Sequence, residues 1–107
     1  MGPRQTYRIC GHQQIASPAA STALTIPTVF NGREVKPNAV LMSASTQAIR
    51  WRADGGAPTA TLGHVLPNAL TVGAPPLYYD GDLTALRFIQ VTAGGLLDVT
   101  YLEDESL

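Results

Sequence analysis

Hydrophobic and polar residues alternate over short stretches of the chain, and proline or glycine interrupts each stretch. Over residues 47–52 the large apolar residues are Ile49 and Trp51. Arg50 and Arg52 occupy the alternate positions. Because successive side chains of a strand point to opposite faces, this stretch is predicted to be a half-buried strand whose Trp51 anchors the core.

Turn signals follow this strand and recur along the chain. Asp54 with two glycines and then Pro58 indicate a chain reversal. Extended character resumes over residues 59–62, which predicts a hairpin around the reversal. The dipeptide Asn31-Gly32 predicts a second tight turn. A further apolar group at residues 69–72 is expected to pair as a short extended segment.

The last third of the chain contains two β-rich runs, LRFIQVTA and LLDVTYL, which flank Gly94-Gly95. Two such runs joined by glycines predict a hairpin. No window longer than about ten residues has the apolar spacing of a helix. A single helical turn over residues 83–85 is the most that the pattern supports.

With 107 residues the chain is expected to form one domain. Its ten glycines and eight prolines fall between apolar runs. We therefore predict an all-β fold, an antiparallel β-sandwich of about eight short strands, for which a jelly roll is one arrangement. Residues 1–10 alternate weakly, which fits a first edge strand or an extended arm, and residues 11–21 are expected to be a surface connection. Residues 1–21 are together predicted to form an extended N-terminal arm. Residues 22–107 form the sandwich and end in a short acidic tail.

Charge is distributed unevenly although the net charge is −1. Up to Arg52 the chain has six basic residues and one acidic residue, and from Ala53 onward it has one basic residue and seven acidic ones. If the fold kept the two halves apart, the molecule would present surfaces of opposite charge. If strands of the two halves interleave, their charges pair within the molecule.

Candidate catalytic and metal-binding residues are few. Cys10 and His12 are two residues apart and His64 is the other histidine, but a zinc site requires three or four ligands. A nucleophilic trio of Cys10, His64 and Asp54 has no strand-turn-helix elbow to support it. We expect no catalytic residue, no cofactor and no metal ligand, and therefore not an enzyme.

Two further motifs are better explained by structure than by ligand binding. Asp80 and Asp82 flank a glycine, which fits a turn better than a calcium loop because the remaining ligands are missing. Arg50, Arg52 and Trp51 resemble a nucleic-acid platform. On a strand, however, the tryptophan faces away from the arginines, so no nucleic-acid partner is expected.

No apolar run approaches the roughly 20 residues of a membrane span, and no secretion signal is visible. We therefore expect no membrane partner, and synthesis in the cytoplasm.

Two segments carry a family resemblance. Residues 49–66, IRWRADGGAPTATLGHVL, resemble a segment of the form IRYRxDGxxPTxxxGHxL in small virion proteins of tailed phages. FIQVTAGGLLDVTY, residues 88–101, resembles their C-terminal strand pair. The resemblance implies a bacteriophage structural protein, a cement or decoration protein on the capsid exterior. It would bind and stabilise the lattice of the major capsid protein as a homo-oligomer, a dimer or a trimer, without catalysis.

Two alternatives remain open. Within virions, the chain could be a head-tail adaptor or a tail- or fibre-associated protein. Outside them, it could be a small carbohydrate-binding β-sandwich, with Tyr78 and Tyr79 as a sugar-stacking surface.

Overall fold

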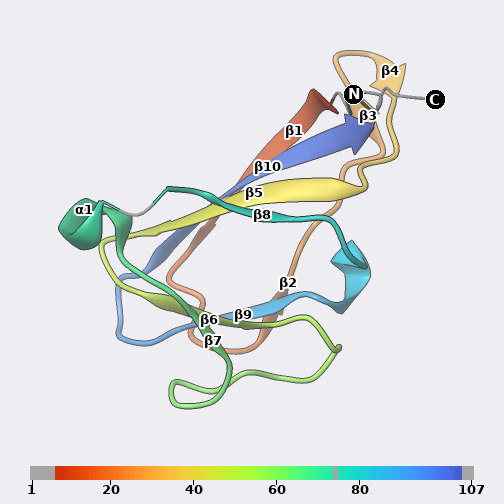
Figure 1. Cartoon of the computed structure of the whole chain (residues 1–107). Coiled ribbons are helices and arrows are strands. Elements are labelled where there is room, and N and C mark those ends of the chain that lie inside the picture. The colour runs from red at the N-terminus through yellow and green to blue at the C-terminus, as the bar shows by residue number, and fades with distance from the viewer. Residues whose placement is uncertain (1–6, 74, 105–107) are drawn as a thin grey trace, which may run out of the picture.

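The computed structural model describes residues 7–73 and 75–104, which form two four-stranded antiparallel sheets facing each other (Figure 1). Sheet A has the order β1 (Tyr7–Ala16), β10 (Leu96–Asp104), β5 (Ala39–Ser45) and β8 (Leu77–Tyr79). Sheet B has the order β2 (Thr22–Ala23), β9 (Arg87–Gln90), β6 (Ile49–Arg52) and β7 (His64–Leu66). The remaining elements are the hairpin of β3 (Val29–Phe30) with β4 (Arg33–Glu34), one helical turn α1 (Ala69–Val72) and the 3₁₀ turn η1 (Leu83–Ala85). The predicted all-β antiparallel sandwich is confirmed.

The strands pair in a nested order. β6 pairs with β7, β5 with β8, β2 with β9 and β1 with β10. Successive pairs alternate between sheets B and A, so the chain is one long hairpin rolled around a core. This is the topology of a jelly roll. The segment 49–66 is its innermost hairpin.

The core lies between the two sheets. Its largest fully buried side chains are Tyr101, Phe88, Met42, Ile49, Leu86, Leu97, Val40, Val99 and Cys10. Tyr101 from sheet A also needs polar partners, because a buried hydroxyl without a hydrogen bond is costly. Its hydroxyl donates to Oε1 of Gln13 at 2.6 Å and also lies 3.2 Å from the carbonyl oxygen of Thr25.

Trp51 is not the central core anchor that the sequence predicts. It is half-buried, whereas Ile49 on the same face of β6 is fully buried. Beyond β6 only the short edge strand β7 follows, so the indole lies at the open side of the sandwich. There its ring centroid is 4.9 Å from that of His64 and 6.1 Å from that of Tyr79.

The predicted N-terminal arm is largely a strand of the sandwich, and β1 is the first edge strand that was the other interpretation of residues 1–10. Within residues 7–16, β1 pairs with β10, interrupted by a register shift between Ile9 and Gly11. Ile15 and Cys10 are buried. The prediction of a surface connection from residue 11 is wrong because inward positions of β1 include glycine and Gln13, which hide the apolar alternation. Residues 1–6 of the arm lie outside the described residues.

The predicted hairpin at Gly94-Gly95 is also wrong. β9 belongs to sheet B and β10 to sheet A, so residues 91–95 carry the chain from one sheet to the other. The side chain of Gln90 accepts hydrogen bonds from the backbone N–H groups of Gly94 and Gly95, both at 3.2 Å. The two β-rich runs face each other across the core instead of lying side by side.

The shorter predictions divide between confirmed and wrong. Asn31 and Gly32 form the β3–β4 turn with φ of 53° and 76°, as expected. The helical turn at 83–85 is confirmed as η1. Residues 59–62 are not a strand, because extended pairing resumes only at β7. Residues 69–72 form α1, because the side chain of Asn68 caps this turn by accepting from the Leu70 N–H at 3.0 Å. Glu103 and Asp104 of the expected acidic tail belong to β10, and residues 105–107 lie outside the described residues.

Candidate functional site

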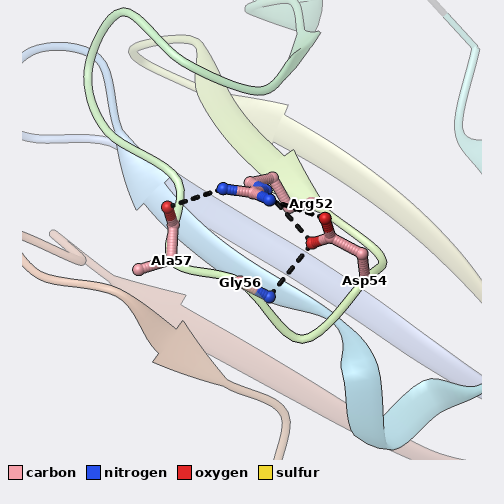
Figure 2. Close-up of polar contacts among 4 residues, drawn as sticks. All are labelled: Arg52, Asp54, Gly56 and Ala57. Atoms are coloured by element: carbon pink, nitrogen blue, oxygen red, sulfur yellow. Dashed lines mark hydrogen bonds and ion pairs between the residues drawn. The ribbon is translucent and has the colours of Figure 1, made fainter.

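The innermost hairpin carries a long loop, residues 53–63, between β6 and β7. Its first half closes around one side chain (Figure 2). Arg52 donates from Nε to Oδ1 of Asp54 at 3.0 Å and from Nη2 to Oδ2 at 2.6 Å. Its Nη1 donates to the carbonyl oxygen of Ala57 at 3.3 Å. The same Asp54 Oδ1 accepts from the backbone N–H of Gly56 at 3.0 Å. One bidentate ion pair therefore fixes this part of the loop.

The glycine at position 56 follows from this arrangement. A Cβ atom there would lie 2.7 Å from Cζ of Arg52, closer than such atoms approach each other. Figure 2 shows the guanidinium lying within the curve of the loop, between Asp54 and Ala57. The glycine-rich sequence makes room for the arginine.

A second arginine fixes the other half of the loop. Arg50 donates from Nε to the carbonyl oxygen of Ala60 at 3.1 Å and from Nη1 to that of Gly63 at 2.8 Å. Thr59 and Leu62 exchange two backbone hydrogen bonds, at 3.0 and 3.2 Å. The two arginines alternate with the inward Ile49 and Trp51, so both point to the outer face of sheet B and reach the loop. We call residues 53–63, held in this way, the braced loop.

The braced loop presents a surface of fixed shape. Leu62 is 53% exposed, and Val65 just beyond it is 50% exposed. A shallow depression of about 530 Å³ is lined by Arg52, Ala53, Asp54, Leu62, Gly63 and His64. The hydrogen bond from Arg52, with that from Gly56, lowers the pKa of the Asp54 carboxyl, so this group stays ionised at neutral pH. The arrangement suits noncovalent contact with a partner, because a loop that is already ordered loses little conformational entropy on binding.

The residues considered for catalysis or metal binding are not brought together. Cys10 is buried in β1, and burial raises the pKa of its thiol. His12 is exposed, with Nε2 3.7 Å from Oδ1 of Asp98. His64 lies on sheet B against Trp51. Across residues 7–73 and 75–104, no three histidine, cysteine, aspartate or glutamate side chains are grouped as metal ligands would be.

Asp82 has a local structural role. Its Oδ1 accepts from the backbone N–H of Thr84 at 3.0 Å and from the Thr84 hydroxyl at 2.6 Å, which caps η1. These bonds lower the pKa of its carboxyl. Residues 80–82 connect β8 to η1 with a bend at Gly81.

Tyr78 and Tyr79 do not form one sugar-stacking surface. They are consecutive in β8 and so point to opposite faces of sheet A. The Tyr78 ring contacts that of Tyr7, with centroids 5.7 Å apart, and Tyr79 contacts Trp51 inside the sandwich. The aromatic group on one side of the fold is instead Trp51, His64 and Tyr79.

Charges of the two chain halves pair within the molecule. Arg8 forms a hydrogen-bonded ion pair with Glu103, and Nη1 of Arg33 lies 3.6 Å from the same carboxylate. The backbone N–H of Lys36 also donates to Glu103, at 2.7 Å. The hydrogen bonds from Arg8 and Lys36 lower the pKa of Glu103. Strands of the two halves thus interleave, and part of their opposite charge is neutralised within the molecule.

Comparisons of the chain with protein-family models, with curated proteins and with solved structures give no match. In the part of the chain that the structure describes, no helix is long and apolar enough to cross a membrane.

Proposed function

We propose that this chain is a structural protein of a tailed-phage virion, a decoration protein that binds the major capsid protein lattice from outside and stabilises it without catalysis. Copies of the chain would also contact one another. The observation that supports the proposal is that residues of the segment resembling phage virion proteins hold the braced loop in its shape. Within that segment Arg50, Arg52 and Asp54 hold the braced loop.

A sequence pattern that specifies a loop shape supports a binding role. The arginine side chains bond to the loop itself, so what the segment offers to a partner is its outer surface, including Leu62 and Val65. Jelly rolls occur in viral capsid proteins and also in lectins, so the fold alone does not decide the function. The segment resemblance favours the virion.

A decoration protein can act through weak contacts. Several contacts made at once to a repeating lattice multiply into avidity when the geometry permits. A rigid loop suits this role, because little conformational entropy is lost at each contact.

The proposal is tested by mixing the purified protein with phage capsids that lack it and sedimenting them. We expect the protein to travel with the capsids. The double variant Leu62→Ser, Val65→Ser should bind several-fold more weakly. Val29→Ser is the matched control, because Val29 is 61% exposed but lies on the β3–β4 hairpin.

If no protein travels with the capsids and micrographs place it only at the tail, the decoration role is excluded and the head-tail adaptor or tail-associated role replaces it.

A second candidate function rests on the aromatic group at the open side of the sandwich. The rings of Trp51 and His64 are in contact with their planes tilted by 40°, and His64 lines the depression of about 530 Å³. An aromatic group beside polar side chains can bind a sugar ring. A glycan array with the wild-type protein tests this role. Binding that His64→Ala abolishes would favour a carbohydrate-binding module over a lattice protein.

A further inference from the structure

The outer face of sheet B carries three arginines. Arg52 and Arg87 are directly opposite each other in the β6–β9 pairing, and Arg50 is opposite Ile89. Like charges in this position repel and destabilise a sheet. We call Arg50, Arg52 and Arg87, with the adjacent Ile89, the basic face.

Two of these arginines lack an acidic partner. Arg87 donates from Nη1 to the carbonyl oxygens of Thr84 and Leu86, both at 2.8 Å. Arg50 bonds only to the loop carbonyl groups. Among the described residues, no carboxylate forms an ion pair with either of them, whereas Arg52 is paired with Asp54. The basic face therefore holds fixed positive charge that the molecule does not neutralise.

An acidic cleft adjoins the basic face. It has a volume of about 470 Å³, and its lining includes Ile26, Val35, Lys36, Asp80, Asp82 and Thr84. Asp82 is held in place by Thr84, and the side chain of Asp80 makes no hydrogen bond or ion pair within the described part of the chain. Thr84 also accepts from Arg87, so the two surfaces meet at this residue.

Two adjacent patches of opposite charge are complementary to the same two patches on a second copy rotated by 180°. We propose that this protein forms a two-fold dimer in which the basic face of each copy contacts the acidic cleft of the other. In that arrangement Arg87 of each copy faces Asp80 of its partner. The dimer therefore contains two equivalent Arg87–Asp80 contacts, and together they neutralise the unpaired charges of both copies. Apolar residues on both patches add burial to the charge pairing.

The composition of the basic face favours a protein partner over a nucleic acid. Ile89, the residue beside its arginines, is aliphatic, and Trp51 points to the opposite face of β6, so no aromatic ring accompanies the arginines for base stacking. The dimer is inferred from the charges and apolar residues of the two patches, independently of the segment resemblance. It specifies the contact between copies that the proposed function includes.

Sedimentation velocity of the full chain over a range of concentrations tests the dimer. We expect concentration-dependent dimerisation at low salt that weakens as salt is raised. Arg87→Glu and Asp80→Arg should each raise the dimer dissociation constant by at least about tenfold, because each places like charges together twice. An equimolar mixture of the two variants should recover dimerisation, since the mixed dimer again joins opposite charges at both contacts.

Arg33→Glu and Asp98→Arg are the matched controls, because both residues lie outside the two patches and should leave the dissociation constant unchanged. Far-ultraviolet dichroism establishes that each variant is folded, and Arg87→Gln replaces Arg87→Glu if the latter is not.

A protein that stays monomeric at low salt and high concentration overturns the inference. A dimer that the charge reversals leave intact, or a mixture without recovery, overturns it too. If the protein is monomeric but still sediments with capsids, this inference fails and the proposed capsid binding stands. If the protein dimerises but does not sediment with capsids, the proposed capsid binding fails and this inference stands.

Discussion

The innermost hairpin, β6–β7, and the outermost pair, β1–β10, are built by contacts of different range. In the innermost hairpin Arg50 bonds to Gly63, 13 residues away. In the outermost pair Arg8 bonds to Glu103, 95 residues away. The first is held largely by side chains bonding to their own loop, and the second by pairing between distant ends of the chain. The inner hairpin shapes a surface, whereas the outer pair closes the sandwich.

The difference also concerns burial. The side chain of Asp54 in the braced loop is 62% exposed, so its ion pair is largely solvated. In the outer pair, the hydrogen bond between Tyr101 and Gln13 joins β10 to β1 in the core. Because polar contacts cost more to break in the core than at the surface, changes to the outer pair should have larger effects.

The largest effect is expected from removing β1. A chain lacking residues 1–16 loses Cys10 and Ile15 from the core, exposes β10 as an edge and leaves Tyr101 without Gln13. We expect it to lose cooperative thermal unfolding measured by circular dichroism. A chain that lacks only residues 1–6 is the control, since it retains all of β1. Cooperative unfolding of the shorter chain near the wild-type temperature would restore the view of residues 1–21 as a dispensable arm.

A smaller effect is expected from the Tyr101 hydroxyl. Burial raises the pKa of Tyr101 from 10.0 to about 12, so the folded state holds this proton more tightly than the unfolded state. The contribution is complete below pH 10 and is lost as pH rises toward 12. Tyr101→Phe should abolish this part of the alkaline decline in unfolding free energy. It should also cost about 1–3 kcal/mol at neutral pH, because Gln13 and Thr25 lose a donor.

Denaturant unfolding of the wild type and Tyr101→Phe between pH 8 and 12 measures both effects. Tyr79→Phe is the matched control, because Tyr79 lies beside Trp51 at the open side of the sandwich. If both substitutions change the alkaline decline equally, burial of Tyr101 is not its cause.

The same contrast explains what could be predicted from the sequence. The all-β sandwich, the turn at Asn31-Gly32 and the helical turn at 83–85 depend on neighbouring residues, and all three were predictable. Which strands pair, in contrast, depends on segments that are far apart in the sequence. That is why β-rich runs flanking Gly94-Gly95 suggested a hairpin although they belong to opposite sheets.

The sequence predicted how the side chains of β6 alternate, but not that this strand and its loop form a candidate site. Alternation correctly placed Arg50 and Arg52 opposite Trp51. That each arginine bonds back to the loop depends on the curvature of residues 53–63, which the alternation pattern does not specify. The two glycines that follow Asp54 are the one local signal of this curvature. Trp51 was misplaced because hydrophobicity predicts a buried face but not how close a strand lies to the edge of its sheet.

The smallest effect on global stability, and the most local one, is expected from Arg52→Ala. Because the pair with Asp54 is exposed, its loss should lower the unfolding free energy only slightly. The braced loop should nevertheless open, so the Gly56 amide should exchange hydrogen several-fold faster and thermolysin should cleave near Leu62 more readily. Arg33→Ala is the matched control, since Arg33 also has one ion pair but lies on β4.

Acid should reproduce the effect of Arg52→Ala in the wild-type loop. The bonds from Arg52 and Gly56 lower the pKa of Asp54, so their stabilisation is present above the ordinary carboxyl pKa and is lost as pH falls through the lowered value. Amide exchange at Gly56, corrected for its intrinsic pH dependence, should therefore rise on acidification in the wild type. In Arg52→Ala it should be fast already at neutral pH and change little on acidification. Equal protection of Gly56 in both proteins would mean that the backbone alone sets the loop shape. The resemblance to phage virion proteins would then rest on residues that do not build the surface.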